Sequence, residues 1–273
     1  MSKQGGSAFK DAFGSVFALL VIVVSYIVCN TLFNTIMGNP VNFEGGNPAG
    51  HALEGNYLGI IYKGGFVVPF LFTCSMVVFV FVIERAITLS KAKGKGRINV
   101  FVRNLQQLLA ADKIEEAIVA CDKQRGSLAN IMKAGLVRYR DLQKDNTLAN
   151  DQKILSIQKA TEEATAIEIP SFQKNMVIFS TLAPGTVLIG LIGTVLGMIR
   201  AFAALAQSGA PDALALSQGI SEALINTALG ITGSLFALIV YNYFSSDIDE
   251  YTFKIDEAGF SLTQSFAASL KKS

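Results

Sequence analysis

Charged side chains are scarce in this sequence: only 16% of its 273 residues are Asp, Glu, Lys or Arg, whereas 51% are hydrophobic. Soluble domains carry closer to a quarter of charged residues, and a disordered chain could not hold so much apolar surface. The composition therefore favours a membrane protein. The net charge of +2 is too small to indicate a nucleic-acid partner.

Cysteine and histidine are rarer still. The three cysteines, Cys29, Cys74 and Cys121, are odd in number and far apart, so they match neither a disulfide framework nor a metal site. His51 is the single histidine. No phosphate-binding glycine motif and no nucleophile beside a plausible base is present. The sequence therefore predicts that the protein is not an enzyme and uses no metal or organic cofactor.

The sequence does contain four long windows without a charged side chain. Each is long enough to cross roughly 30 Å of hydrocarbon as a helix, at about 1.5 Å per residue. The predicted membrane-spanning helices are residues 16–37, 64–83, 175–199 and 223–246. The basic residues before the first window resemble those of a secretory signal, but no small-residue cleavage site follows. We therefore expect this additional N-terminal helix to be retained.

Lysine and arginine are distributed unevenly around these windows. Of the 23 basic residues, 16 lie between the second and third windows, whereas residues 38–63 contain only Lys63 and residues 201–221 contain none. The positive-inside rule then fixes one orientation for all four helices. The segments predicted to be cytoplasmic are the N-terminus 1–15, the middle segment 84–174 and a C-terminal helix 247–273, and the predicted periplasmic loops are 38–63 and 200–222.

The middle segment has apolar residues at three- and four-residue spacing, which is the pattern of amphipathic helices. Four helices are predicted, at residues 100–111, 114–124, 128–145 and 154–167. Gly126 and Ser127 mark a break, and Pro170 is expected at a kink in a long helix that enters the membrane. The predicted fold class is all-α: a polytopic membrane protein with four transmembrane helices and a cytoplasmic helical bundle.

A basic run, Lys91 to Arg97, opens the middle segment. It could bind the anionic headgroups of membrane lipid. Alternatively, it only sets the topology of the neighbouring helices on a flexible link. The sequence leaves both interpretations open.

The third and fourth predicted helices each carry small and polar residues on one face. These residues are Gly190, Gly193, Thr194 and Gly197 on the third helix, and Asn226, Thr227, Gly230 and Ser234 on the fourth. Small residues let membrane helices approach closely, so packing alone is one explanation. The other is chemical. Thr194 and Thr227 lie at one depth, about 8–9 Å inside the external edge, and their hydroxyls can both donate and accept hydrogen bonds.

Neither of these two windows contains Asp, Glu, His, Lys or Arg. A proton pathway across a membrane normally needs a titratable group. If the threonine layer serves ion flow, a partner helix must therefore supply the carboxylate. If it does not, the protein is a membrane scaffold whose small faces serve packing only.

Two runs, Gly190–Ile199 and Gly219–Gly230, resemble the signatures of the third and fourth helices in the ExbB/TolQ branch of the MotA/TolQ/ExbB proton-channel family. Ile83, Glu84 and Arg85 match the end of the preceding helix. The sequence departs from the family pattern at Thr186–Val187, where an Ala-Pro pair is common, and at Phe236, where a proline is often found. The first helix and the loop after it are additions to the usual three-helix ExbB plan. MotA, the flagellar stator subunit, has the same four-helix plan, but the residues of the two signatures favour ExbB and TolQ.

The resemblance implies a function in the bacterial inner membrane. A homo-oligomer, expected to be a pentamer, would surround two copies of an ExbD-like or TolR-like single-helix protein whose membrane Asp carries protons, the coupling ion. An ExbB-like subunit would couple proton flow to TonB-dependent outer-membrane import through a TonB-like protein. A TolQ-like envelope motor and a MotA-like stator are the alternatives.

The resemblance also assigns roles to single residues. Thr194 and Thr227 would line the pore, and Glu222 would be the acidic residue at its external entrance. Glu222 could instead stabilise the start of its helix, where a carboxylate is favourable, and Arg200 could pair with it or anchor the helix at the interface. Glu84 and Arg85 would contact the partner at the cytoplasmic end, or form an interfacial ion pair.

Overall fold

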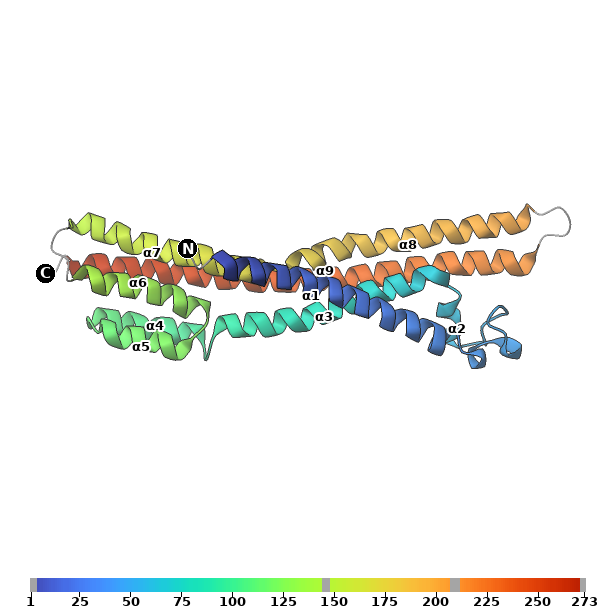
Figure 1. The fold of residues 1–273 in the computed structure, drawn as a ribbon, viewed down its shortest axis with the longest axis horizontal. Coiled ribbons are helices and arrows are strands. Elements are labelled where there is room, and N and C mark those ends of the chain that lie inside the picture. Colours follow the sequence, from blue (N-terminus) through green and yellow to red (C-terminus); the bar gives the residue numbers. More distant parts are fainter. Residues whose placement is uncertain (1–3, 144–147, 207–211, 271–273) are drawn as a thin grey trace. The chain divides into compact units, whose positions relative to one another are not determined.

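The computed structural model describes residues 4–143, 148–206 and 212–270, with side chains from residue 16 to residue 268. Within these ranges the chain is helical and contains no β-strand. Its α-helices are α1 (Gln4–Leu32), α2 (Tyr57–Tyr62), α3 (Val68–Lys93), α4 (Ile98–Ala110), α5 (Ile114–Gln124), α6 (Ser127–Gln143), α7 (Asn150–Gln173), α8 (Met176–Leu205) and α9 (Ala213–Leu270) (Figure 1). Parts of four predicted segments lie outside the described residues: 1–3 of the N-terminus, 144–145 of a predicted cytoplasmic helix, 207–211 of the second predicted periplasmic loop and 271–273 of the C-terminal helix.

Four helical stretches of the described chain are long and apolar enough to cross a membrane. They are Val16–Met37, Gly65–Ala110, Asn150–Leu205 and Ala213–Ala268. Each contains one of the four uncharged windows or most of it. The all-α class and the four membrane-spanning helices are therefore confirmed.

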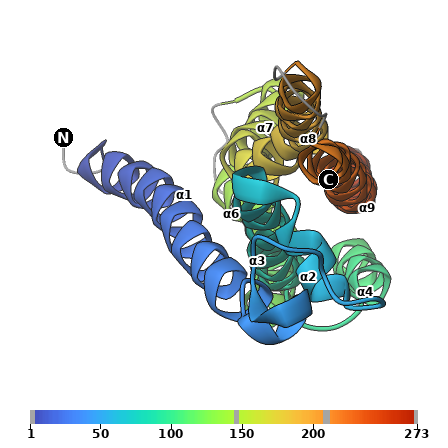
Figure 2. The same ribbon diagram turned by 90° about the vertical axis from the view of Figure 1, so that its right-hand side faces the viewer.

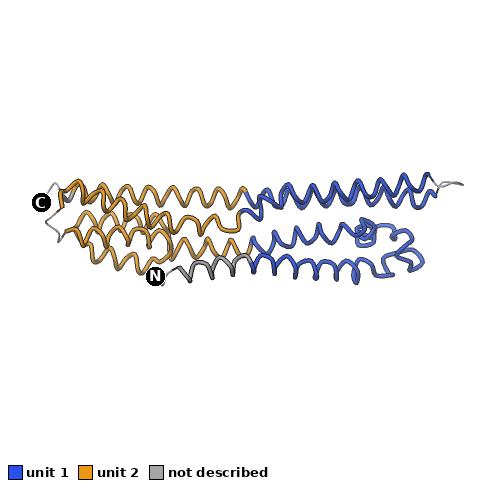
Figure 3. The backbone as a smooth tube through the Cα atoms, turned by 45° about the horizontal axis from the view of Figure 1, so that its top comes forward, with its two compact units in different colours: residues 1–82, 177–241 blue, residues 83–176, 242–273 orange. Residues whose placement is uncertain are grey.

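The chain divides into two compact units, which are coloured separately in Figure 3. The first unit consists of residues 1–82 and 177–241, and the second of residues 83–176 and 242–273. The first unit thus contains the uncharged parts of α1, α3, α8 and α9. The second contains the four helices α4 to α7 and the charged ends of α3 and α9.

In the first unit, α8 and α9 run side by side (Figure 1). The helix α1 packs against α3 through two aromatic pairs, Phe17 with Phe81 at 6.2 Å and Tyr26 with Phe70 at 5.1 Å between ring centroids. In the view of Figure 2, α1 lies apart from α8 and α9. The outer face of α1 remains exposed and apolar. Its exposed residues are Val16, Leu19, Leu20, Val23, Val24 and Ile27. Such a face is expected of a helix that meets lipid rather than water.

The segment between α1 and α3 is organised by asparagine side chains. Asn42, which is buried, donates to the carbonyls of Ile36 and Met37 and accepts a hydrogen bond from Asn56. Asn56 in turn caps α2 by accepting from the backbone of Leu58. These bonds satisfy backbone groups that a loop would otherwise leave without partners. The segment therefore has a defined structure.

We call this segment the external segment, after the side of the membrane predicted for it from the sequence. Three side chains hold its backbone carbonyls, and we call these bonds the carbonyl ties. Lys63 donates to the carbonyl of Pro48, and Gln218 of α9 donates to that of Ala49, both at 2.8 Å. Asn226 of α9 donates to the carbonyl of Gly64, also at 2.8 Å. The external segment is thereby attached to α9 at two points.

In the second unit, the predicted helix at 114–124 is α5, with the same bounds, and those at 100–111 and 128–145 correspond to α4 and α6 within two residues. The helix predicted at 154–167 is part of α7, which begins four residues earlier and ends six residues later. The buried face of α5 follows the predicted spacing, with Ile114, Ala117, Ile118 and Cys121 in the core. Tyr139 of α6 contacts Phe266 of α9 edge to face, with their centroids 4.4 Å apart. The helices predicted to form a cytoplasmic bundle thus pack around a common core.

Helix ends differ from the predicted ones in three places. α8 continues past Arg200 to Leu205, and α9 begins at Ala213, so much of the predicted loop 200–222 is helical. α9 also runs on through residue 246 without a break. Pro170 lies inside α7, and the helix that was expected to continue into the membrane ends at Gln173, shortly before Asn175, which has a positive φ of 65°. Asparagine tolerates this left-handed conformation better than most residues.

Candidate functional site

The hydroxyls of Thr194 on α8 and Thr227 on α9 face each other. Their oxygens are 2.5 Å apart, and both hydroxyls also lie within hydrogen-bond distance of the carbonyl of Ala223, at 3.2 and 3.1 Å. Thr194 reaches the carbonyl of Gly190 as well, at 3.1 Å. Both side chains are half-buried. The common depth expected from the sequence therefore corresponds to direct contact, and the pair forms a compact cluster of oxygens inside an apolar hairpin.

Glycines bring the two helices close enough for this contact. A Cβ added to Gly190 would lie 2.8 Å from the carbonyl oxygen of Asn226 and 3.0 Å from the Cα of Gly230. A Cβ added to Gly197 would lie 2.7 Å from the carbonyl oxygen of Gly219. Real Cβ atoms do not approach other atoms so closely. The backbones of α8 and α9 are therefore in contact on both sides of the threonine pair.

Asn226 occupies the space left by a third glycine. A Cβ on Gly193 would lie 2.6 Å from the Cβ and Cγ of Asn226, whose side chain is fully buried. Asn226 uses its amide nitrogen in the tie to Gly64, while its Oδ1 receives no hydrogen bond within the described structure. Of the predicted packing residues, Gly190, Gly193, Gly197, Asn226 and Gly230 meet in this contact. Ser234 is half-buried one turn further along α9.

Glu222 lies near the external end of α9 and is held by two other elements. Arg200 of α8 donates from Nη1 to both carboxylate oxygens, at 2.7 and 2.6 Å. The Glu222 side chain is 6% exposed and that of Arg200 is 54% exposed. On the other side, a Cβ on Gly65 would lie 2.6 Å from Oε1 of Glu222, and Gly65 has a positive φ of 75°. Only glycine fits this position without strain.

Glu222 and the threonine pair point in different directions. Five residues separate Glu222 from Thr227 on α9, which corresponds to about 140° around the helix. Within one chain the carboxylate therefore contacts Arg200 and lies beside Gly65, while the hydroxyl of Thr227 contacts that of Thr194. The two predicted pathway groups share a region of the first unit without touching each other.

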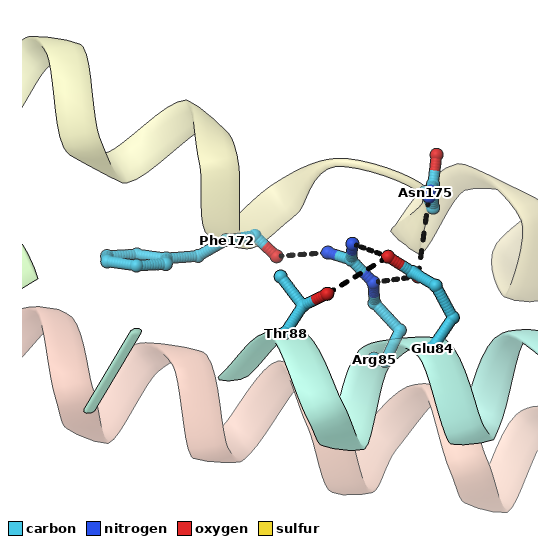
Figure 4. Close-up of polar contacts among 5 residues, drawn as sticks. All are labelled: Glu84, Arg85, Thr88, Phe172 and Asn175. Atoms are coloured by element: carbon cyan, nitrogen blue, oxygen red, sulfur yellow. Dashed lines mark hydrogen bonds and ion pairs between the residues drawn. The ribbon is translucent and has the colours of Figure 1, made fainter. Parts of the chain in front are cut away.

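In the second unit, Glu84 and Arg85 form an ion pair that Figure 4 shows in detail. Arg85 donates from Nε and Nη2 to the two oxygens of Glu84, each at 2.6 Å, and from Nη1 to the carbonyl of Phe172 at 3.3 Å. Thr88 and Asn175 donate to the same carboxylate (Figure 4). Arg85 is 1% exposed, so its hydrogen bonds are made inside the chain. A contact between a partner protein and this part of α3 would therefore be made by Glu84 rather than by Arg85.

Sequence reasoning did not find the contribution of Gly65 or Gly219. Each acts by making room for residues far away in sequence, Gly65 for Glu222 and Gly219 for Gly197. The signal available was the glycine itself, inside the predicted helix 64–83 in the case of Gly65 and in the predicted loop 200–222 in the case of Gly219. Among the described residues, no group of three or more His, Cys, Asp or Glu side chains could hold a metal ion.

Residues 123–257 match the model of the MotA/TolQ/ExbB proton channel family. This range includes α6 to α8 and most of α9, and therefore both members of the threonine pair. The region outside it contains α1, the external segment, α3, α4 and all but the last two residues of α5.

Individual relatives carry names from two branches of that family. An ExbB-like biopolymer transport protein of Synechocystis is 36% identical over 89 residues, which is 32% of this chain and 42% of that protein. The Tol-Pal system protein TolQ of Haemophilus influenzae is 26% identical over 199 residues, 70% of this chain and 85% of that protein. The biopolymer transport protein ExbB of Pseudomonas putida is 31% identical over 81 residues, 30% of this chain and 25% of that protein. The matches to the two ExbB relatives thus span less than half of their lengths.

Proposed function

Because the chain belongs to the MotA/TolQ/ExbB proton channel family, we propose that it is a subunit of an energy-transducing motor in the bacterial inner membrane. The four helices that could span a membrane support this location. In the proposed orientation both termini and the second unit are cytoplasmic, as the uneven distribution of lysine and arginine suggests.

The observation that carries the proposal is the Thr194–Thr227 hydroxyl pair in an otherwise uncharged hairpin. Each hydroxyl can donate and accept, so the pair can hydrogen-bond a carboxyl group in either protonation state. The uncharged windows of α8 and α9 supply no carboxyl group of their own. We propose that several copies of this chain, five by analogy with the family, surround two helices of an ExbD-like protein whose membrane Asp faces these hydroxyls. Protons are the coupling ion.

We propose that this motor drives TonB-dependent import through a TonB-like protein. The ExbB relatives support this branch, since they are the more identical ones over the segments they share. A TolQ-like role in envelope maintenance is the second candidate, because the alignment with TolQ covers 85% of that protein. A MotA-like stator has only the four-helix plan in its favour.

Valine substitution of the threonines tests the proposal. Thr194→Val and Thr227→Val keep the β-branched shape and remove the hydroxyl, and hydrogen bonds between membrane helices are worth only about 0.6 kcal/mol on average, so assembly should survive. We expect partner-dependent proton uptake by proteoliposomes to fall at least about ten-fold, which corresponds to about 1.4 kcal/mol of lost pathway stabilisation.

Serine is the matched control, because Thr194→Ser and Thr227→Ser keep the hydroxyl and should retain most of the flux. The amount of complex is measured in parallel. Normal proton uptake in both valine variants, with normal amounts of complex, would favour a scaffold whose small faces serve packing only.

A further inference from the structure

A groove of about 760 Å³ lies between α4 and α5 in the second unit, and the family resemblance gives it no role. Three cations, Lys95, Arg97 and Lys123, stand at one end of it, and its walls include the apolar side chains of Val100 and Val119. We infer that this groove binds a soluble single-chain amphiphile with an anionic head, of the fatty-acid class. Four observations within this unit support the inference.

The basic end of the groove has a fixed backbone. The amide of Lys95 donates to the carbonyl of Gln124 at the end of α5, at 2.7 Å. Gly94 and Gly126 both have positive φ angles, and a Cβ on Gly94 would lie 2.1 Å from the carbonyl oxygen of Arg125. Two segments of backbone are therefore in contact at this point. The basic run that the sequence presents as a flexible link is instead seated against the α5–α6 turn.

The three cations have no acidic partner in the described part of the chain, where the ion pairs involve other residues. The acids at the far end of the groove are engaged elsewhere: Glu116 pairs with Lys113 at 2.9 Å, and Glu115 lies 3.6 Å from Arg140. The first turn of α4 contains no acidic residue, and its N-cap residue, Arg97, makes no side-chain cap. The positive end of the α4 dipole thus adds to the charge of the cations, and this end of the groove favours an anion.

A buried donor at the same end also lacks an acceptor. The Nε2 atom of Gln124, a residue that lines the groove, is buried and makes no hydrogen bond within the described structure. A buried donor without a partner costs about 1–3 kcal/mol. A carboxylate bound between the cations would provide acceptors for this amide as well as for Lys95 and Arg97.

The walls of the groove favour an apolar chain behind that head. Val100 is 63% exposed and Val119 is 50% exposed, although Phe101 and Leu105 of α4 and Ile114 and Ile118 of α5 are buried. Covering these side chains with a hydrocarbon chain would gain roughly 25 cal/mol per Å² of apolar surface removed from water. An inorganic anion would fill only the basic end.

The position of the groove along α3 indicates a soluble ligand. Lys93, where α3 ends, is ten residues beyond Ile83, the end of the uncharged window. Ten helical residues extend about 15 Å, and about 11 Å along the membrane normal at a tilt of 40°. The headgroup layer is roughly 5–8 Å thick on each side. A phospholipid anchored in the bilayer would not reach the groove with its acyl chain.

Photo-crosslinking tests the inference on the full chain in phosphatidylcholine nanodiscs. The probe is palmitic acid carrying a diazirine on its chain, and labelled peptides are identified by mass spectrometry. We expect label on residues 98–123 that falls about ten-fold in the double variant Lys95→Gln, Arg97→Gln, and also in Val119→Glu, which changes the apolar wall and leaves the cations in place. Label on α1, whose outer face meets lipid, provides an internal reference that no variant should change.

Two controls sharpen the test. Arg103→Gln removes an exposed arginine of α4 that does not line the groove, so its labelling should equal that of the unmodified chain. The alcohol with the same chain and diazirine should label α1 without labelling residues 98–123. Circular dichroism of each variant verifies that the bundle is folded.

Several results would overturn the inference. One is equal labelling of the groove in the double variant and the unmodified chain, and another is equal labelling by the alcohol. A third is labelling of the groove by a photoreactive phosphatidylglycerol in the disc but not by the palmitic acid probe, because the ligand would then be a bilayer lipid. A fourth is protection of the groove by an acidic peptide but not by excess palmitate, which would make the site a protein-docking surface.

Discussion

At the scale of single residues, Glu222 and Arg200 form an ion pair whose two members are unequally buried. The carboxylate is nearly inaccessible, whereas the guanidinium of Arg200 is about half exposed. Removing Arg200 should therefore cost more stability than removing Glu222. A buried carboxylate without a partner is costly, while an arginine at the surface can return to water.

We expect Arg200→Gln to destabilise the chain more than Glu222→Gln does. The difference should be about 1–2 kcal/mol, a value reduced from that of a fully buried pair because Arg200 is partly solvated. Thermal unfolding of the purified chain in detergent measures it. If Glu222 also feeds the proton pathway, Glu222→Gln should slow partner-dependent flux per complex. Normal flux with less complex would assign Glu222 to structure alone.

Cys121 should be almost inert towards alkylating reagents. Burial in the core of the second unit, assisted by the negative charge of Asp122 and opposed by Lys133, raises the pKa of its thiol to about 12. Only the thiolate reacts, so the rate should increase about ten-fold per pH unit from pH 7 to pH 10 without a plateau. Iodoacetamide labelling in a Cys29→Ala, Cys74→Ala background measures this. A plateau near pH 9 would show that the thiol titrates as a free cysteine does.

At the scale of elements, the glycines of α8 determine how closely α9 can approach. Gly190 meets the backbone of α9, whereas Gly185 on the same helix has no atom within 4 Å of the position of an added Cβ. Gly190→Val should therefore destabilise the hairpin by about 1–3 kcal/mol, the usual cost of overpacking, and Gly185→Val should be close to neutral. Thermal unfolding of both variants tests this pair. Equal losses of stability would mean that helix propensity, and not the close approach, matters at these positions.

The elements themselves were largely predictable, because uncharged windows and amphipathic spacing determine where the helices are. Their ends were less so. Arg200 and Glu222 marked the expected edges of the hydrocarbon, but a charge does not stop a helix, and α8 and α9 continue past them. α9 begins where the side chain of Asp212 accepts hydrogen bonds from the amides of Leu214 and Ala215. Helix ends follow such local capping rather than the membrane boundary.

The candidate site, like the elements, was predictable from the sequence only in part. The threonine contact was predictable because two hydroxyls at one depth on antiparallel neighbours must lie close together. The roles of Gly65 and Asn226 were not, because each depends on a partner far away in sequence: Glu222 for Gly65, and Gly64 for Asn226. Such contacts leave no periodicity in a single sequence.

At the scale of the whole molecule, the uncharged windows of α8 and α9 make the proposed function dependent on a second protein. We predict that mild solubilisation from the native membrane will recover a small single-helix protein with an Asp in its membrane segment. Mass spectrometry of the purified material identifies it, and its periplasmic part distinguishes ExbD-like from TolR-like or MotB-like partners. Failure to recover any such protein, under conditions that keep other membrane complexes intact, would support the packing scaffold.

The carbonyl ties of the external segment have an evolutionary consequence. Lys63, Gln218 and Asn226 all bind main-chain oxygens, those of Pro48, Ala49 and Gly64. Every residue type presents a main-chain oxygen, so positions 48 and 49 can change in evolution as long as the backbone keeps its conformation. Position 64 is restricted by packing instead, because a Cβ there would lie 2.5 Å from Cγ2 of Val68. The donors do not have this freedom. Selection on the attachment of this segment should therefore be recorded mainly in residues 63, 218 and 226, two of which lie on α9, outside the segment that they hold.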